Sequence, residues 1–268
     1  MQLETVNNSL CSAVILGRLK LSTKLMGQHM LCYPSLPSTM EKAREEAVKG
    51  VPEGTVIAVD EQTAGRGRLE RTWFSPRGSL TFSIVLRPPS EEHLPQLVML
   101  ASLAVVNAIE SVTRLRPQIK WPNDVLINGK KVCGILIENI FRGKALDFSL
   151  VGIGLNVNFS PAAMPEIAST ATSLSVETGQ EVNMLELLSQ LLLEMERLYL
   201  GVKAGRKVYG PWLKRVETVG KEVSVTFSEG GAVEKGVVEA IDNEGGLILV
   251  CPDGRRIRVV AGDVTLQV

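Results

Sequence analysis

The sequence has no excess of charge, no paired cysteine motif and few histidines. Lys plus Arg and Asp plus Glu each number 29 among 268 residues. A nucleic-acid-binding module usually carries a basic excess, so general polyanion binding is not expected. The four cysteines are scattered without CxxC spacing, and there are two histidines. This composition disfavours a zinc site and a disulfide framework, and we expect reduced thiols in a cytoplasmic protein.

The chain also lacks two common nucleotide-binding motifs and an N-terminal membrane anchor. No Walker A sequence is present, and the glycines of "VGIGLNVN" (151–158) neither complete GxGxxG nor lead into a helix. The apolar run "CSAVIL" (11–16) is too short for a membrane span, and no basic residue precedes it. We therefore expect no membrane contact. Any nucleotide must be bound by a different kind of site.

Periodicity and turn residues predict a mixture of helices and strands. A helix is expected to begin at Ser38, because Ser38 and Glu41 have capping-box spacing and Gly50 is a natural end. Asn128-Gly129 predicts a type I′ hairpin turn, since both central residues of that turn need positive φ. Further helices are expected at 94–113, about 183–201 and about 207–217, and strands at 55–62, 79–88 and 146–158.

The C-terminal part has a different pattern. From Val219 onward, short β-rich runs alternate with glycine-containing turns. This pattern is typical of a small antiparallel barrel. We expect an N-terminal extension (1–27), a larger domain (28–217) and a barrel (218–268).

The segment "AGRGRLERTWFSPRG" (64–78), called here the arginine–glycine loop, is both positive and rich in glycine. Its arginines offer planar forks that match carboxylate and phosphate oxygens. Gly65 and Gly67 would let backbone N–H groups approach an anion, and Trp73 could stack on a planar ring such as adenine. From spacing alone, a solvated basic turn with Trp73 in the core is an equal alternative.

The segment "KWPND" (120–124) contains candidate phosphate and metal ligands. Asp124 is a candidate Mg²⁺ ligand, because hard cations prefer carboxylate oxygen, and Lys120 could contact a phosphate. An ordinary turn uses the same residue types, so this segment alone is weak support.

The segment "GKKVCGILIE" (129–138) places a lysine within an apolar strand. If the strand alternates, Lys131, Cys133 and Ile135 share one face and Gly134 lies on the other. Lys131 must then reach an anion or extend to water, since burying an unpaired charge is costly. Gly134 leaves room for a ligand or backbone, and we interpret Cys133 as a small core residue.

Together and in this order, these segments resemble the biotin–protein ligase family over residues 28–268. "QTAGRGRLERTWFSPRGSL" is similar to the family's GRGRxxRxWxSPxG loop, and "KWPND", "KKVCGIL" and "GIGLNVN" follow at similar intervals. The resemblance implies an α+β catalytic domain of class II aminoacyl-tRNA-synthetase-like fold, with a mixed sheet and helices, followed by an SH3-like β-barrel. It also implies an ATP-dependent, AMP-forming ligase. Such an enzyme makes biotinyl-5′-AMP, releases pyrophosphate and transfers biotin to a lysine of a biotin carboxyl carrier domain.

The same resemblance assigns site residues by motif. It implies Lys131, Arg66 and Arg68 as catalytic residues. The biotin site would comprise Ser38, Thr39, Gln62, Gly65, Arg66, Gly67, Arg68, Lys131 and Gly134. The ATP and adenylate site would comprise Arg68, Arg71, Trp73, Lys120, Asn123, Asp124 and Asn156, with Mg²⁺ at Asp124. Homodimers are common in the family.

The sequence departs from the family at two positions. Met40 stands where the family usually has Asn, so one biotin contact is open. Gln267 stands near an arginine of some relatives, so a nucleotide contact from the barrel is open as well.

Three alternatives to a biotin ligase remain. A lipoate–protein ligase or octanoyltransferase would resemble the same fold, but neither histidine is followed by the aspartate expected there. A DNA-binding repressor is disfavoured because about 27 residues precede the match, too few for a DNA-binding domain. A non-catalytic binding module is supported only by the barrel.

Overall fold

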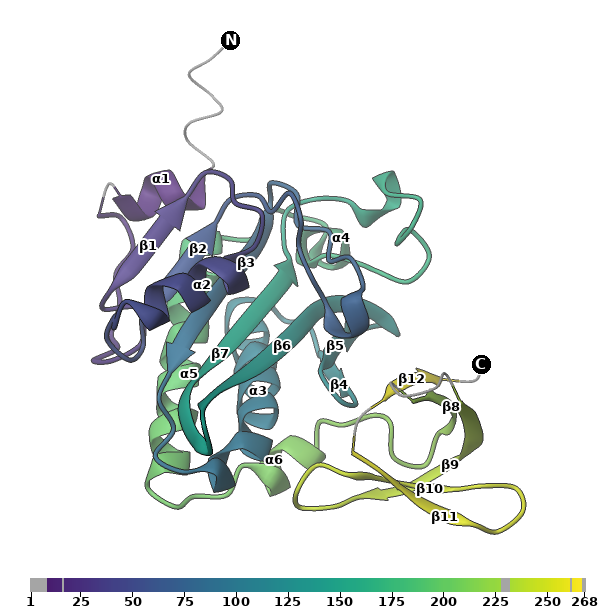
Figure 1. The fold of residues 1–268 in the computed structure, drawn as a ribbon. Coiled ribbons are helices and arrows are strands. Elements are labelled where there is room, and N and C mark those ends of the chain that lie inside the picture. Colours follow the sequence, from purple (N-terminus) through teal and green to yellow (C-terminus); the bar gives the residue numbers. More distant parts are fainter. Residues whose placement is uncertain (1–8, 16, 228–231, 261, 267–268) are drawn as a thin grey trace.

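Two sheets organise the protein, which is described by a computed structural model covering residues 9–15, 17–227, 232–260 and 262–266. A seven-stranded sheet has the order β1-β2-β3-β7-β6-β5-β4, and a five-stranded sheet has the order β11-β10-β9-β8-β12 (Figure 1). In the larger sheet β1 and β2 are parallel and the other neighbours are antiparallel. The smaller sheet is antiparallel throughout.

The elements follow one another in a simple order along the chain. The larger sheet contains β1 (Met30–Tyr33), β2 (Val56–Val59), β3 (Ser79–Leu86), β4 (Gln118–Lys120), β5 (Asp124–Ile127), β6 (Lys130–Arg142) and β7 (Ala145–Asn156). The helices are α1 (Leu10–Ile15), α2 (Thr39–Val48), α3 (Leu94–Val112), α4 (Leu174–Thr178), α5 (Met184–Lys203) and α6 (Tyr209–Leu213). Short 3₁₀ turns are η1 (Arg68–Glu70), η2 (Glu91–His93) and η3 (Pro161–Ala163). The smaller sheet contains β8 (Glu222–Thr226), β9 (Val233–Ile241), β10 (Leu247–Val250), β11 (Arg256–Val259) and β12 (Asp263–Leu266).

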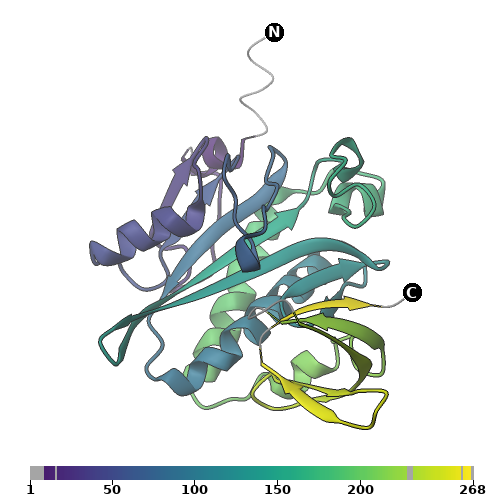
Figure 2. The same ribbon diagram turned by 45° about the vertical axis from the view of Figure 1, so that its right-hand side comes forward.

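This architecture confirms the predicted α+β class with a C-terminal antiparallel β domain. The predicted hairpin is confirmed as well, because Asn128 and Gly129 have φ of 51° and 76° between β5 and β6. In Figure 2 the C-terminal sheet lies below the end of the larger sheet that carries β4 and β5.

Helices cover both faces of the larger sheet, so its strands are buried on two sides. Alternation in β2 sends Val56 and Ala58 into the main core with α3 and α5, and Ile57 into a second cluster under α2. In Figure 1, α2 lies in front of the sheet and α3 and α5 lie behind it. On the α2 face, β3 carries buried Thr81 and Ser83 instead of large apolar residues. These small polar side chains begin the site described below.

Helix α3 is the central helix of the core, as predicted for 94–113. The segment Glu91–Val112 is long and apolar enough to cross a membrane, yet 61% of its most apolar stretch is buried inside the protein. It packs against α5 and against β6 of the sheet. Its apolar composition is therefore explained by contacts within the protein.

The N-terminal residues expected as a separate extension pack onto the larger domain. Leu10 and Met26 are 3% and 0% exposed in the main core. The buried Glu196 carboxylate of α5 accepts hydrogen bonds from the backbone N–H groups of residues 24, 25 and 26. Neither α1 nor β1 was predicted, because segments of six and four residues are too short to show periodicity.

Candidate active site

A cavity of about 130 Å³ lies between α2, the arginine–glycine loop and the centre of the larger sheet. Four cationic side chains and one acidic side chain line it, namely Arg66, Arg68, Arg71, Lys131 and Asp124. The other predicted residues in its lining are Ser38, Thr39, Gln62, Gly67, Trp73, Asn123 and Gly134. The fold thus brings twelve predicted residues from five separate segments to one place, and their net charge is suited to an anion.

One end of the cavity is lined by neutral side chains that form a hydrogen-bond network. Gln62 Oε1 accepts from the Thr39 amide at 2.8 Å and from the Thr39 hydroxyl at 3.1 Å. The Ser83 hydroxyl of β3 donates to Thr39 Oγ1 at 2.8 Å. Because Gln62 Oε1 is occupied in this way, the orientation of its side-chain amide is set before any ligand binds.

The capping-box prediction for Ser38 was wrong. Ser38 is the N-cap residue of α2 in extended conformation, but its side chain makes no capping hydrogen bond. The Gln62 side chain takes over part of that role by accepting from the Thr39 N–H group. The Ser38 side chain instead lines the cavity. The predicted end of the helix is confirmed, since Gly50 follows it with φ of 87°.

The arginine–glycine loop folds back on itself as a narrow hairpin. Trp73 N–H donates to the Gly65 carbonyl at 2.9 Å, and Gly67 N–H donates to the Arg71 carbonyl at 2.7 Å. At the tip, Leu69 adopts the left-handed conformation with φ of 54° and ψ of 40°. The backbone of this loop is therefore ordered by its own hydrogen bonds.

The two glycines of this hairpin have a different role from the one predicted. A Cβ on Gly65 would lie 2.3 Å from the Trp73 carbonyl oxygen, so glycine is needed for the close approach of the two arms. The Gly67 amide already donates to Arg71, so it is not aimed at an anion. The expected backbone cradle is wrong for Gly67, because the hairpin consumes that N–H group.

Trp73 lies across two glycines of the sheet. Gly134 and Gly154 are cross-strand partners on β6 and β7. A Cβ on Gly154 would lie 2.3 Å from Trp73 Nε1, and one on Gly134 would lie 3.0 Å from Trp73 Cζ3. The indole Nε1 is buried and has no hydrogen-bond partner in the protein. The unsatisfied indole N–H is therefore held against the backbone of the sheet at Gly154, where leaving a buried donor unpaired is costly.

Lys131 lies on the same face as Gly134, which corrects the predicted alternation of β6. The register with β5 shifts between Cys133 and Lys131, so Val132 has no cross-strand partner there. This β-bulge inserts one residue and reverses the faces on its N-terminal side. Lys131 Nζ consequently lies 3.4 Å from the position a Gly134 Cβ would take.

A direct ion pair joins two of the predicted residues. Lys131 Nζ lies 2.7 Å from Asp124 Oδ1, and their side chains are 34% and 18% exposed. Lys131 Nζ also lies 5.4 Å from the centre of the Trp73 ring. The candidate catalytic cation and the candidate metal ligand are thus neighbours, and an incoming anion would compete with Asp124 for Lys131.

Arg68 links the hairpin tip to two other parts of the chain. Its guanidinium donates to Asn123 Oδ1 at 3.1 Å and to the Gly262 carbonyl of the C-terminal domain at 3.2 Å. Arg66, by contrast, is half exposed and lies 3.2 Å from Glu41 of α2. The two candidate catalytic arginines are therefore bonded to different parts of the chain.

Three predicted residues do not line the cavity, and one position lies outside the described residues. Gly65 lies in the hairpin, where its carbonyl accepts from the Trp73 N–H group. Lys120 ends β4 opposite Asp124, and buried Asn156 donates to the Thr172 carbonyl at 2.9 Å. Gln267 is not among the described residues.

Met40 and Cys133 are core residues. The Met40 side chain is 4% exposed and packs in the cluster under α2, while its sulfur would lie 2.7 Å from a Cβ on Gly152. Cys133 is fully buried, and burial raises the pKa of its thiol, which confirms its interpretation as a small core residue.

Sequence reasoning missed several residues of the lining. These are Leu69, Thr72, Thr81, Ile135, Leu136 and Ile153. The glycines of "VGIGLNVN" gave a usable signal, because positions 152 and 154 lie on one face of a strand, and both line the cavity. Thr81 had none, since a single Thr in an apolar strand is common.

Comparisons with known proteins point to one family for both domains. Residues 33–156 match the biotin/lipoate A/B protein ligase family, and residues 218–266 match the biotin protein ligase C-terminal domain. The bifunctional ligase/repressor BirA of Bacillus subtilis is 42% identical over 185 residues, which cover 68% of this chain and 57% of that protein. The biotin–[acetyl-CoA-carboxylase] ligase of Paracoccus denitrificans is 34% identical over 227 residues, which cover 81% of this chain and 94% of that enzyme.

A solved structure extends this likeness to three dimensions. The biotin protein ligase of Aquifex aeolicus in complex with biotin and ATP matches with a TM-score of 0.77 and 31% sequence identity. The match covers 90% of this chain and 99% of that one.

Proposed function

The chain belongs to the biotin–protein ligase family, and we propose that it activates biotin with ATP and transfers it to a lysine of an acceptor domain. The first step joins biotin and ATP as biotinyl-5′-AMP and releases pyrophosphate. The observation that supports this proposal most is that one cavity is lined both by four cationic side chains and by a neutral hydrogen-bond network around Thr39 and Gln62. The Paracoccus denitrificans and Aquifex aeolicus relatives are named as biotin ligases, which favours biotin over lipoate or octanoate.

Charge compensation is the main demand of the first step. Biotin attacks through a carboxylate, and the nucleotide is a polyanion. Two unit charges about 4 Å apart repel by roughly 4 kcal/mol at an effective dielectric near 20. Lys131 and Arg68 offset this repulsion at the reacting groups, and Arg66 and Arg71 contribute positive charge at the cavity. No general base is required, because a carboxylate is already ionised at pH 7.

Asp124 and Asn123 are assigned to the nucleotide side of the cavity. Within the described part of the chain, no three His, Cys, Asp or Glu side chains form a group that could hold a metal ion. Mg²⁺ commonly uses one or two carboxylates together with substrate phosphates and water, and Asp124 fits that donor set as the acidic residue of the lining. Bound there with ATP, Mg²⁺ would neutralise phosphate charge.

Transfer to the acceptor completes the reaction. The amine of an acceptor lysine attacks the biotinyl carbonyl, the C–O bond to phosphate breaks, and AMP leaves. The hairpin of the arginine–glycine loop covers the cavity and would limit attack by water until the acceptor arrives. The acceptor is proposed to be a biotin carboxyl carrier domain, in agreement with the name of the Paracoccus denitrificans relative.

The cellular location of the protein, its lack of DNA binding and its assembly are further parts of the proposal. The four cysteines are free, as expected of a protein in the reducing cytoplasm. DNA binding is not part of the proposed activity, since Lys plus Arg equals Asp plus Glu. A homodimer stays a prediction, which analytical ultracentrifugation with and without biotin would test.

The test is to incubate the protein with Mg-ATP, biotin and a biotin carboxyl carrier domain, and then to weigh the acceptor. We expect one biotin-sized mass increase that depends on ATP and on the acceptor lysine. An increase with lipoate or octanoate but not with biotin would support the alternative acyltransferase. An unchanged acceptor under all conditions would contradict the proposal.

A further inference from the structure

The loop of the "KWPND" segment contacts both the cavity and the C-terminal domain. Lys120 ends β4 and Asp124 begins β5, and these two residues pair across the strands. The loop between them is only three residues long, so its residues cannot move independently. Asn123 and Asp124 line the cavity, whereas the buried Trp121 side chain lies against the C-terminal domain.

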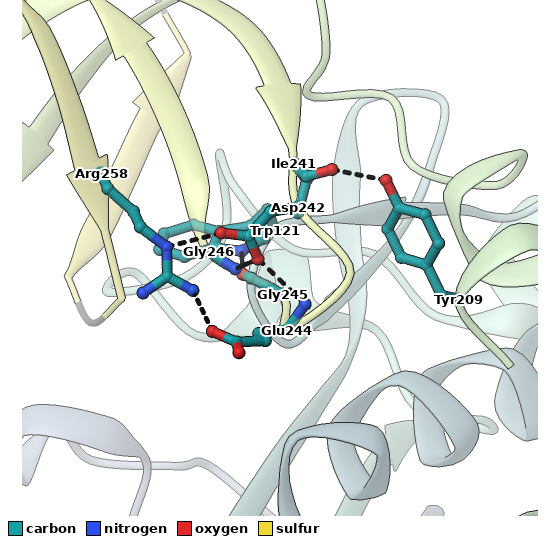
Figure 3. Close-up of polar contacts among 8 residues, drawn as sticks. All are labelled: Trp121, Tyr209, Ile241, Asp242, Glu244, Gly245, Gly246 and Arg258. Carbon is teal, nitrogen blue, oxygen red and sulfur yellow. Dashed lines mark hydrogen bonds and ion pairs between the residues drawn. The ribbon is translucent and has the colours of Figure 1, made fainter. Parts of the chain in front are cut away.

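Trp121 is attached to the C-terminal part of the chain at both backbone and side chain. Its indole N–H donates to the Gly245 carbonyl at 2.8 Å (Figure 3). Its backbone N–H donates to Thr218 Oγ1 at 2.9 Å. Trp121 is 2% exposed, so water does not compete for these bonds. The position of the loop therefore depends on the turn that presents Gly245.

That turn, residues 242–246, is braced by Asp242. Asp242 Oδ1 accepts from the backbone N–H groups of Glu244 and Gly246 at 2.9 and 2.8 Å. Arg258 of β11 donates to Asp242 Oδ2 at 2.5 Å and to Glu244 at 2.7 Å. The bond from Arg258 holds the pKa of Asp242 below its usual value, so the bracing carboxylate is ionised at neutral pH.

The larger domain also contacts this turn and the residue before it. The Tyr209 hydroxyl of α6 donates to the Ile241 carbonyl at 2.6 Å (Figure 3). Gly245 has φ of 87°, and a Cβ there would lie 3.0 Å from Met99 Cε of α3. The geometry of the turn is thus defined by both domains.

A second contact connects the C-terminal domain to the same part of the site. Arg68 bonds both the Gly262 carbonyl and Asn123 Oδ1. Asn123 Nδ2 in turn donates to the Ile135 carbonyl of β6 at 2.6 Å. Asn123 is therefore located by β6, by the arginine–glycine loop and, through Trp121, by the turn.

We propose that the turn 242–246 is a positioning element for the nucleotide side of the active site, acting through Trp121 on Asn123 and Asp124. The proposal rests on the proposed function, because it concerns adenylate formation. It makes Trp121, Asp242 and Arg258 positioning residues that contact neither substrate. The network of Thr39 and Gln62 has no contact with the turn among the described residues, so biotin binding alone should not depend on it.

The test compares single substitutions in the full chain. Trp121→Phe removes the indole donor and keeps an aromatic ring. Asp242→Ala removes the brace, and Asp242→Asn keeps an oxygen acceptor for the two backbone N–H groups. Glu239→Ala is the matched control, because Glu239 is an exposed carboxylate paired with Arg256 of β11 at 2.5 Å.

Biotin-dependent pyrophosphate release gives kcat and the KM for ATP, and calorimetry gives the Kd of biotin without nucleotide. We expect kcat/KM for ATP to fall about tenfold or more in Trp121→Phe and Asp242→Ala, since small displacements of positioned groups cost rate steeply. The biotin Kd should stay at the parental value, Asp242→Asn should recover most of the loss, and Glu239→Ala should match the parent.

The proposal is overturned if Trp121→Phe and the folded Asp242 variants keep the parental kcat/KM for ATP. It is also overturned if the biotin Kd weakens by the same factor, which would indicate general loosening of the fold. If the unmodified protein released no pyrophosphate, the proposed function would fail instead, before any variant is compared.

Discussion

Lys131 and Asp124 are the pair on which the chemistry of the site is centred. The 2.7 Å ion pair keeps the ammonium group of Lys131 in the cavity without a substrate. An arriving carboxylate or phosphate then exchanges one anionic partner for another, so the lysine is never left unpaired in a partly buried position. The β-bulge at Val132 is what directs Lys131 to this face.

We predict that Lys131→Ala abolishes biotin-dependent pyrophosphate release. The rate should fall by about a hundredfold or more, because this is the typical effect of removing a group that stabilises developing charge. The matched control is Lys130→Ala, because Lys130 is the preceding residue and is exposed outside the cavity. Near-normal release by a folded Lys131→Ala protein would remove this lysine from the mechanism.

Trp73 depends on the absence of side chains at two positions of the sheet. The cross-strand glycines 134 and 154 let the indole lie directly on the backbone. The other two tryptophans, Trp121 and Trp212, are 2% and 1% exposed. Changes in solvent access to tryptophan therefore report on Trp73.

We predict that Gly154→Ala displaces Trp73, because the new Cβ would lie 2.3 Å from its Nε1 atom. Acrylamide quenching of tryptophan fluorescence should increase. Gly210→Ala serves as control, since a Cβ there meets no atom within 4 Å. Quenching that stays at the parental level in Gly154→Ala would contradict this account of the indole position.

At the scale of elements, the arginine–glycine loop is a hairpin whose tip is bonded to other parts of the chain through Arg68. Backbone bonds between Gly65 and Trp73 and between Gly67 and Arg71 order its arms. Arg68 attaches the tip to Asn123 and to Gly262. Opening of the cavity therefore requires the loop tip to move relative to both domains.

We predict that Arg68→Gly lets the biotinyl-adenylate escape before transfer. Lysines of an added bystander protein should then carry biotin, which mass spectrometry would detect. Arg77→Gly is the control within the same loop, because Arg77 is exposed and pairs only loosely with Glu61 at 3.9 Å. Bystander labelling no greater than that of the control would argue against retention by the hairpin tip.

At the scale of the whole molecule, the two sheets share one hydrophobic core. Ile241 and Leu247 of the C-terminal sheet belong to the same buried cluster as Leu97 and Met99 of α3. The bonds of Trp121 to Gly245 and of Tyr209 to Ile241 cross the same boundary. The C-terminal domain is therefore packed as part of the enzyme and not as an independent module.

We predict a single cooperative unfolding transition for both sheets. In differential scanning calorimetry the van 't Hoff and calorimetric enthalpies should agree, as for one cooperative unit. Tyr209→Phe should lower stability by about 1 kcal/mol through loss of one partly buried hydrogen bond, without splitting the transition. Two resolved transitions in the unmodified protein would show that the shared core does not couple the domains.

The sequence by itself determined the long elements with strong local signals and the set of chemical groups. Strong periodicity defined α3, Asn128-Gly129 defined the hairpin, and regular turn spacing defined the C-terminal strands, because these signals are local. Motif order along the chain was enough to indicate the family. Residue chemistry offered Arg68 and Lys131 as groups for an anionic ligand and Asp124 as a ligand for Mg²⁺, and the order of the motifs favoured these roles over ordinary structural ones.

Only the tertiary structure decided how these groups are presented. The face of Lys131 depends on a bulge set by pairing with β5, and the free side chain of Ser38 depends on Gln62 occupying the cap. The position of Trp73 requires two glycines from different strands. Asn123 is held by Arg68 and Ile135, and Trp121 of the same loop is bonded to Gly245, more than a hundred positions away. Contacts between distant segments leave no periodic trace in sequence, so the order of the motifs could be predicted but their geometry could not.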